Sequence, residues 1–97
     1  MWGSLNPSQY KRIDSTTGSV SVAAGQHNMT GLLCAQSGTG IIEIWDTATD
    51  DSAAGAQLVV DAITLVAGQP EPIPAKFNLG IYIKKISGTY KATVFFD

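Results

Sequence analysis

Residues able to do acid–base, nucleophilic or metal chemistry are few in this sequence. His27 is the single histidine and Cys34 the single cysteine. A Ser–His–Asp or Cys–His mechanism needs a nucleophile in contact with a base, and a third group that orients the base. No basic cluster or helix start stands near Cys34 to activate its thiol. The sequence therefore predicts no enzyme. Cys34 is expected to be a small buried hydrophobe, and His27 a solvated turn residue.

The acidic residues are the remaining candidates for ligand binding. Asp46, Asp50, Asp51 and Asp61 lie in and beside one loop, residues 46–56, and no Lys or Arg stands between Glu43 and Asp61. Calcium prefers several oxygen ligands, but this spacing is not that of an EF-hand. A solvated acidic loop is the prediction, with a weak cation site as the alternative. Zinc needs about four N or S ligands, and this chain offers two, His27 and Cys34. No glycine-rich phosphate loop is present, so we assign no metal and no cofactor.

The elements that carry these residues are short β-rich runs separated by glycine-containing turns. Strands are predicted at 19–22, 29–36, 40–46, 57–66, 79–86 and 89–96, with an earlier one near Gln9–Asp14. No helix is expected. Prolines at 70, 72 and 74 remove alternate backbone donors, so this segment is predicted to be an extended crossover or an edge.

Several landmarks recur in the same order along the chain. Residues 20–26 match 63–69 through Ala-Gly-Gln, Ser37-Gly38-Thr39 matches Ser87-Gly88-Thr89, and both halves close on an aromatic residue followed by Asp. We predict a jelly-roll-like antiparallel β-sandwich whose pseudo-repeated halves are about 19–46 and 62–97. Residues 9–97 form the single domain, and residues 1–8 form an extended N-terminal arm.

The composition argues against two classes of partner, nucleic acids and membranes. Charged residues make up 14% of the 97 residues, and the net charge is −2, against about 25% charged residues in an average soluble protein. Nucleic-acid binding needs a concentrated basic footprint, which is absent here. The apolar runs are far shorter than the roughly 20 residues that span a bilayer, so no membrane contact is expected. The first residues do not resemble a signal peptide, and we expect synthesis in a cytoplasm.

Several predicted strands are apolar on both faces. Examples are Leu32-Leu33-Cys34, Leu58-Val59-Val60 and Val94-Phe95-Phe96. One face of such a strand can fill the core, and the other must meet solvent, the arm or another subunit. The sequence therefore favours a function through surface contacts.

A resemblance makes this more specific. The run Ala62–Gln69, followed by Leu79–Ile83, Ser87–Thr89 and the closing Thr93–Asp97, resembles small virion structural proteins of tailed bacteriophages, and the similarity covers roughly residues 10–97. In that group a strand ending in Ala-Gly-Gln, a Gly-Leu/Ile-Tyr strand and a closing Val-Phe-Phe-Asp strand recur. The arm lies outside the similarity, and the acidic loop and the proline segment look like insertions.

The resemblance implies a head decoration or cement protein that stabilises the capsid. It would be made in the bacterial host cytoplasm and located in the virion. Its partners would be the major capsid protein and copies of itself, with a trimer favoured. The expected interface residues are Trp2, Leu5, Tyr10, Trp45, Asp50 and Asp51. One alternative is a small neck or tail component. Another is a carbohydrate- or receptor-binding module that uses Trp45, Tyr82 or Tyr90 as a stacking platform.

Overall fold

The computed structural model describes residues 9–97 except residue 38. These residues form eight strands. They are β1 Gln9–Asp14, β2 Val20–Ala24, β3 His27–Ser37, β4 Ile41–Asp46, β5 Gln57–Thr64, β6 Pro70–Phe77, β7 Gly80–Ser87 and β8 Tyr90–Phe96. The described part contains no helix, and thus none long and apolar enough to cross a membrane. The predicted all-β class is confirmed.

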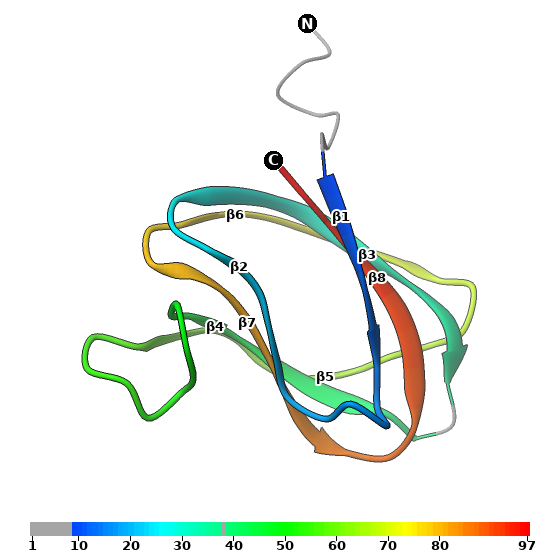
Figure 1. Cartoon of the computed structure of the whole chain (residues 1–97). Helices are drawn as coiled ribbons and strands as arrows, with labels where there is room; N and C mark the ends of the chain where they lie inside the picture. Colours follow the sequence, from blue (N-terminus) through cyan, green and yellow to red (C-terminus); the bar gives the residue numbers. More distant parts are fainter. Residues whose placement is uncertain (1–8, 38) are drawn as a thin grey trace, which may run out of the picture.

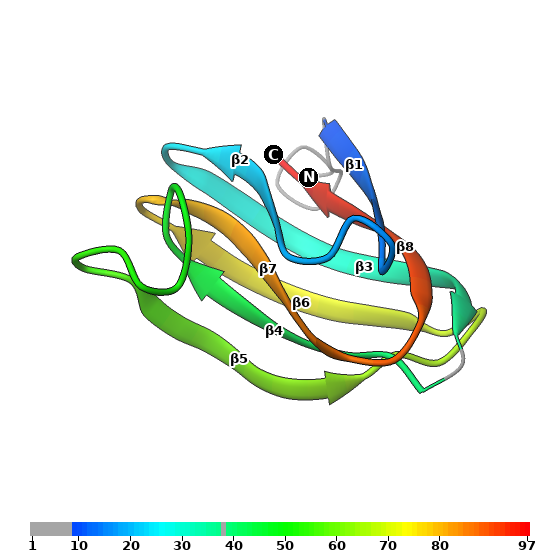
Figure 2. The same ribbon diagram turned by 60° about the horizontal axis from the view of Figure 1, so that its bottom comes forward.

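The strands form two antiparallel four-stranded sheets packed against each other as a β-sandwich (Figures 1 and 2). The first sheet has the order β1-β8-β3-β6 and the second β2-β7-β4-β5. Across the two sheets, the chain doubles back between β4 and β5, which gives the antiparallel pairs β1·β8, β2·β7, β3·β6 and β4·β5. Successive pairs in this series lie in alternate sheets. We interpret this order as a jelly roll.

The two halves of the chain correspond strand by strand. Adding four to β1 and β3, and subtracting four from β6 and β8, turns the order of the first sheet into that of the second. The turns before β4 and β8 correspond and touch, because a side chain on Gly88 would overlap the backbone of Thr39 and Gly40. The Ala-Gly-Gln segments differ: Gly25 follows β2 and Gly68 follows β5, which are not equivalent strands. The repeat is therefore clear in topology and in the later turns.

The core lies between the sheets and is built from alternate residues of each strand. In β8 the inward positions are buried and the positions between them are half-buried or exposed, as period-two geometry requires. The largest fully buried side chains include Tyr90, Phe77 and Met29. Cys34 is fully buried, which confirms the expectation for this residue.

Asp46 fixes the turn between β6 and β7. Its Oδ1 accepts hydrogen bonds from the backbone N–H groups of Leu79 (2.8 Å) and Gly80 (3.3 Å), and its Oδ2 accepts one from Asn78 (3.1 Å). Burial by itself would raise the pKa of Asp46, but the hydrogen bonds from Leu79, Asn78 and Gly80 outweigh it and hold the pKa below its usual value. The carboxylate is therefore a structural acceptor that joins the end of β4 to a distant turn.

A second polar lock joins the end of β1 to the start of β8. The Ser15 backbone N–H donates to the carbonyl oxygen of Tyr90, and the Tyr90 N–H donates to Ser15 Oγ, both at 3.0 Å. The Tyr90 side chain is 1% exposed, and its hydroxyl has no hydrogen-bond partner among the described residues. Burial, with a smaller effect of the Asp14 charge, raises the pKa of Tyr90. The ring thus contributes to packing, while the hydroxyl carries an uncompensated desolvation cost.

The proline segment is a strand at the edge of the first sheet, paired only with β3. Its residues alternate in exposure, so that the three prolines share the solvent side. An edge strand tolerates proline because only one side of its backbone must form ladder hydrogen bonds. The edge prediction is therefore confirmed. A Cβ on Gly31 of β3 would come 3.2 Å from Cα of Pro72 and closer still to the Glu71 carbonyl oxygen, so β6 can pack here only against glycine.

Candidate interaction surface

The outer face of the first sheet carries two rows of side chains that cross its strands. Directly paired residues in antiparallel strands point to the same face. The register therefore sets Tyr10, Phe95, Gly31 and Pro72 in one row, and Arg12, Thr93, Leu33 and Pro70 in the next. Tyr10 is 68% exposed and Leu33 39%. We call Tyr10, Leu33, Pro70, Pro72 and Phe95, with the gap at Gly31, the apolar face.

The apolar face is hollowed where the glycine lies. A shallow groove of about 530 Å³ runs along β3 and β6 and is lined by residues 30–33, 70–72 and Phe95. A second groove of about 600 Å³ shares Thr30 and Pro72 with the first and continues toward Lys76 and Asp97. One wall of the first groove is the Phe95 ring and the other is proline. Both walls are stiff, so the hollow is preformed for an apolar side chain.

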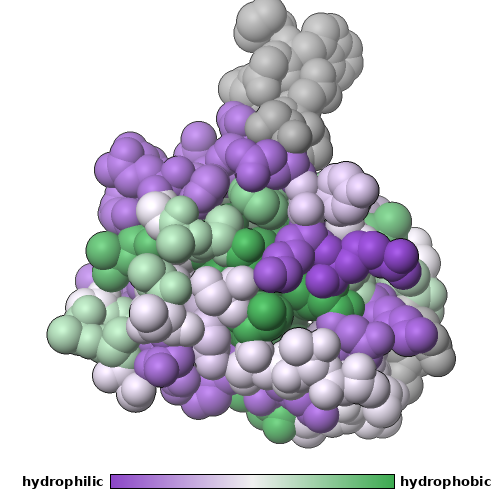
Figure 3. All heavy atoms as spheres, in the orientation of Figure 1, coloured by the Kyte–Doolittle hydropathy of each residue, from purple (hydrophilic) through white to green (hydrophobic). Residues whose placement is uncertain are grey.

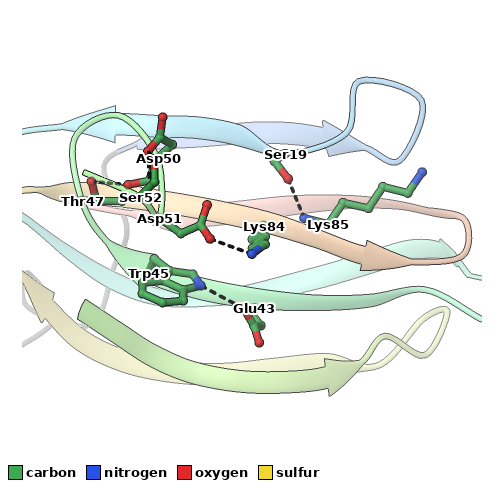
Figure 4. A network of polar contacts seen from close by, with 9 residues as sticks. All are labelled: Ser19, Glu43, Trp45, Thr47, Asp50, Asp51, Ser52, Lys84 and Lys85. Atoms are coloured by element: carbon green, nitrogen blue, oxygen red, sulfur yellow. Dashed lines mark hydrogen bonds and ion pairs between the residues drawn. The ribbon is translucent and has the colours of Figure 1, made fainter. Parts of the chain in front are cut away.

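Part of the outer face of the second sheet, over β7 and β2, is covered by the chain itself. The segment 47–56 bends back over β7, where Asp51 Oδ2 lies 2.6 Å from Lys84 Nζ (Figure 4). Ser21 Oγ donates to the carbonyl oxygen of Ala48 at 3.2 Å, which fixes the same segment to β2. Tyr82 lies on β7 between these contacts and is 8% exposed. The hydrogen bond to Asp51 raises the pKa of Lys84.

The aspartates of the acidic loop do not converge. Asp46 holds the β6–β7 turn, Asp51 pairs with Lys84, and Asp50 Oδ1 accepts hydrogen bonds from the N–H and hydroxyl of Ser52 at 2.9 and 2.6 Å. These bonds to Ser52 lower the pKa of Asp50. In the part of the chain that the structure describes, no group of three or more His, Cys, Asp or Glu could hold a metal ion. The acidic side chains instead fix their own loop.

The aromatic residues proposed as a stacking platform are not exposed together. Tyr82 and Tyr90 are buried, and Trp45 is half-buried with its Nε1–H donating to Glu43 Oε1 at 3.0 Å. Burial of the two tyrosines removes the flat exposed surface that a sugar ring would need. Among the described residues, the large aromatic side chain that is exposed is Tyr10, on the apolar face of the first sheet.

His27 is not a solvated turn residue, which corrects the prediction from its neighbours. It is the first residue of β3 and is half-buried. Its Nε2 lies 2.9 Å from the Ala24 carbonyl oxygen and its Nδ1 lies 3.1 Å from that of Asp97. The ring also packs edge-on against Phe96, with centroids 5.3 Å apart. His27 therefore anchors the end of β8.

Two of the six predicted interface residues, Trp2 and Leu5, lie outside the described residues. Tyr10 is part of the apolar face. Trp45, Asp50 and Asp51 lie on or beside the second sheet, away from that face. The prediction missed Pro70 and Pro72 as surface residues. The sequence signals were the alternate spacing of the prolines and the run Leu32-Leu33-Cys34, which is apolar on both faces of its strand.

Other apolar side chains reach the surface away from the apolar face. On the side shown in Figure 3, hydrophobic residues emerge in separate places between hydrophilic ones. Exposed examples away from the first sheet's outer face are Leu58, Val59, Val66, Leu79 and Ile86. Isolated apolar residues are normal on a soluble protein. Leu58 of β5 pairs directly with Trp45 of β4, so the second sheet also has neighbouring apolar residues, whereas on the first sheet the exposed apolar residues line a groove.

Function must be inferred from this chain alone. No family model, curated protein or solved structure gave a significant match to it.

Proposed function

We propose that this protein is a structural component of a tailed-bacteriophage virion, a decoration or cement protein that binds the major capsid protein and stabilises the head. The observation that carries the proposal is the apolar face on the outside of the first sheet. The sequence resemblance to small phage virion proteins supports the particular setting. Self-association, with a trimer favoured, is part of the same proposal.

The mechanism is burial of surface that the isolated domain leaves exposed. Tyr10 on β1 and Leu33 on β3 are exposed large apolar residues on the outer face of the first sheet, and Phe95 lies on β8, the strand between β1 and β3. Contiguous apolar surface is characteristic of an interaction site. A protein that binds only the assembled shell lowers the free energy of that shell relative to free subunits. Each fully buried apolar side chain contributes about 1.5–3 kcal/mol before the cost of ordering is subtracted.

The distribution of charge fits subunit contacts. Five of the eight acidic residues lie in 43–61, and four of the six basic residues lie in 76–91. Part of this separation is used internally by Asp51 and Lys84. The rest can steer an encounter and fix its register, which is the main effect of charges at the rim of an interface.

The experiment that tests the proposal is a copy-number measurement. Quantitative mass spectrometry of purified phage particles compares this chain with the major shell protein. A ratio near one, or a simple fraction of one, is expected for a decoration protein. A handful of copies per particle would assign the protein to the neck or tail. Its absence from particles would refute the virion role and leave a separate binding module.

Deletion of residues 1–8 tests the part played by the arm. We expect the truncated protein to stay folded, because the described core is built from residues 13–96, and to lose binding to purified capsids. Tyr10→Ser in the full chain is the matched surface variant. Undiminished capsid binding by the truncated protein would show that the arm is not a contact.

A further inference from the structure

We propose that copies of this chain associate head to tail through two strand edges, with β5 of one molecule lying against β1 of the next. The inference rests on the self-association that is part of the proposed function, and it names the two surfaces that form the contact. Because the contact lies at the edges of the sheets, the apolar face stays free to bind a shell.

Two of the four sheet edges are protected against pairing with another strand. The edges are β1 and β6 in the first sheet, and β2 and β5 in the second. On β6 the prolines at 70, 72 and 74 remove backbone donors, which is a common protection of an edge. β2 spans only five residues, and its Ser21 hydroxyl binds the carbonyl oxygen of Ala48 in the segment 47–56. β1 and β5 are therefore the edges left for a partner.

The edge of β5 has the properties of a strand that another chain can join. It pairs only with β4, and all its residues except Val60 and Ile63 are exposed. It contains no proline and no basic residue. Leu58 and Val59 are large apolar residues that are 43% and 39% exposed. A long edge strand with exposed apolar side chains is a template for strand pairing.

The first half of β5 is the part expected to form the contact. The register between β4 and β5 shifts on both sides of Val60, so the strand is bent there. Beyond this bend, Asp61 Oδ1 already accepts the Ala62 N–H at 2.8 Å, which occupies that backbone donor. We therefore place the contact at Gln57–Val60, with the Asp61 carboxylate beside it.

The edge of β1 carries the opposite charge. β1 pairs only with β8, and its residues 9–12 are exposed. Two of them, Lys11 and Arg12, are basic. Lys11 Nζ extends past the edge toward β2, where it lies 3.4 Å from the Ser21 carbonyl oxygen. β1 lies on the side of the sandwich opposite β5, so one molecule can use both edges at once (Figure 2).

Charge favours the pair β5–β1 over a pair of identical edges. Lys11 and Arg12 occupy the middle of β1, so two antiparallel copies of β1 would set basic residues opposite each other, which is destabilising. Asp61 is the charged residue of β5. Pairing of β5 with β1 instead brings this carboxylate to the two cations. A contact between different edges is heterologous, and such contacts close into a ring, as the favoured trimer requires.

The test reverses the charge of each edge and then of both. The full chain is studied by analytical ultracentrifugation over a range of concentrations, as the wild type, as Lys11→Glu with Arg12→Glu, as Asp61→Lys, and with all three substitutions. Lys76→Glu is the control, because it reverses an exposed charge on the protected edge β6. Circular dichroism verifies that each variant is folded.

We expect the wild type to form a concentration-dependent trimer. Reversal of either edge alone should raise the dissociation constant by about tenfold, the three substitutions together should restore it, and Lys76→Glu should leave it unchanged. A monomer at every concentration would overturn the proposal, as would an oligomer that neither edge variant weakens. An effect of one edge only, without rescue by the combination, would indicate pairing of identical edges and also overturn it.

This result is independent of the copy-number measurement. A chain that is absent from phage particles but associates through β1 and β5 would refute the virion role and leave the edge contact in place. A chain that is abundant in particles but insensitive to the edge variants would refute the edge contact alone.

Discussion

Replacing Asp46 by Ala should lower the free energy of unfolding more than replacing most other polar side chains of this protein. The carboxylate accepts three backbone hydrogen bonds from the β6–β7 turn, and Gly80, one of the donors, is buried. A hydrogen bond to a charged group contributes about 1.5–3 kcal/mol. In the variant, water can accept hydrogen bonds from the N–H groups of the exposed residues Asn78 and Leu79 in place of the carboxylate. The total loss is therefore less than the sum of three such bonds, and we expect about 3 kcal/mol. In a domain of this size that lowers Tm by roughly 10–20 °C.

Asp46→Asn separates charge from shape. Its amide keeps one acceptor oxygen but turns an NH2 group toward a backbone donor, so about half of the loss is expected, ~1.5 kcal/mol. Asp61→Asn is the control, since this exposed carboxylate accepts a hydrogen bond from the adjacent Ala62 N–H, at 2.8 Å, and joins no distant turn among the described residues. Guanidinium chloride unfolding at about pH 7 measures all three variants. An Asp46→Ala protein within about 0.5 kcal/mol of the wild type would refute the assigned role.

The same residue makes a signed pH prediction. The pKa of Asp46 is lower in the folded protein than its usual value of 3.8. Its contribution to stability is therefore present in full above that value and is lost as the pH falls through the lower folded-state pKa. The difference in stability between the wild type and Asp46→Asn should shrink in this acid range. Asp14 and Asp50 titrate there too, but they are common to both proteins and cancel in the comparison.

Three further substitutions test other parts of the structure. Tyr90→Phe should raise the free energy of unfolding by about 1 kcal/mol in chemical denaturation, because it removes a buried hydroxyl without a partner among the described residues. Since burial raises the pKa of Tyr90 from 10.0, the wild type should also lose stability above that pH while the variant does not. Gly88→Ala should destabilise by about 2 kcal/mol or more, because its positive φ is combined with backbone overlap. Gly18→Ala has a similar φ and open space, so it should cost less in the same assay. Asp51→Asn should speed amide hydrogen exchange in the loop that Lys84 holds, with the core unchanged; unaltered loop exchange would mean that the ion pair does not fix it.

The local sequence pattern was sufficient to predict the positions of most strands, but not which strands pair in the sheets. Period-two alternation and glycine turns indicated the β class and most strand positions, because both are properties of adjacent residues. The segment at 70–77 was expected as a crossover or an edge, since its prolines exclude only a central strand. The prediction that His27 is a solvated turn residue was wrong, because it rested on the residues beside it in the sequence. The ring contacts the carbonyl oxygen of Asp97, seventy residues away, which those residues do not indicate.

The candidate surface was predictable in part for the same reason. Leu33 and Phe95 belong to runs that are apolar on both faces, so outward apolar residues were expected there. That they line one groove with Pro72 depends on the registers of three strands, which no local pattern specifies. Asp46 shows the converse. Proximity in sequence grouped it with the acidic loop, whereas folding carries it to a turn more than thirty residues away.

The position of β8 has a consequence for how the chain folds. This strand lies between β1 and β3, so the first sheet lacks one of its two central strands until residues near 96 have left the ribosome. Of the eight strands, β1 is synthesised first and stays unpaired for the longest time, because its partner in the sheet is β8, the last strand. Such pairing of distant segments slows folding and prolongs the exposure of unpaired strands. We therefore expect a slow, nearly all-or-none folding reaction after synthesis, during which chaperones have the longest access to β1.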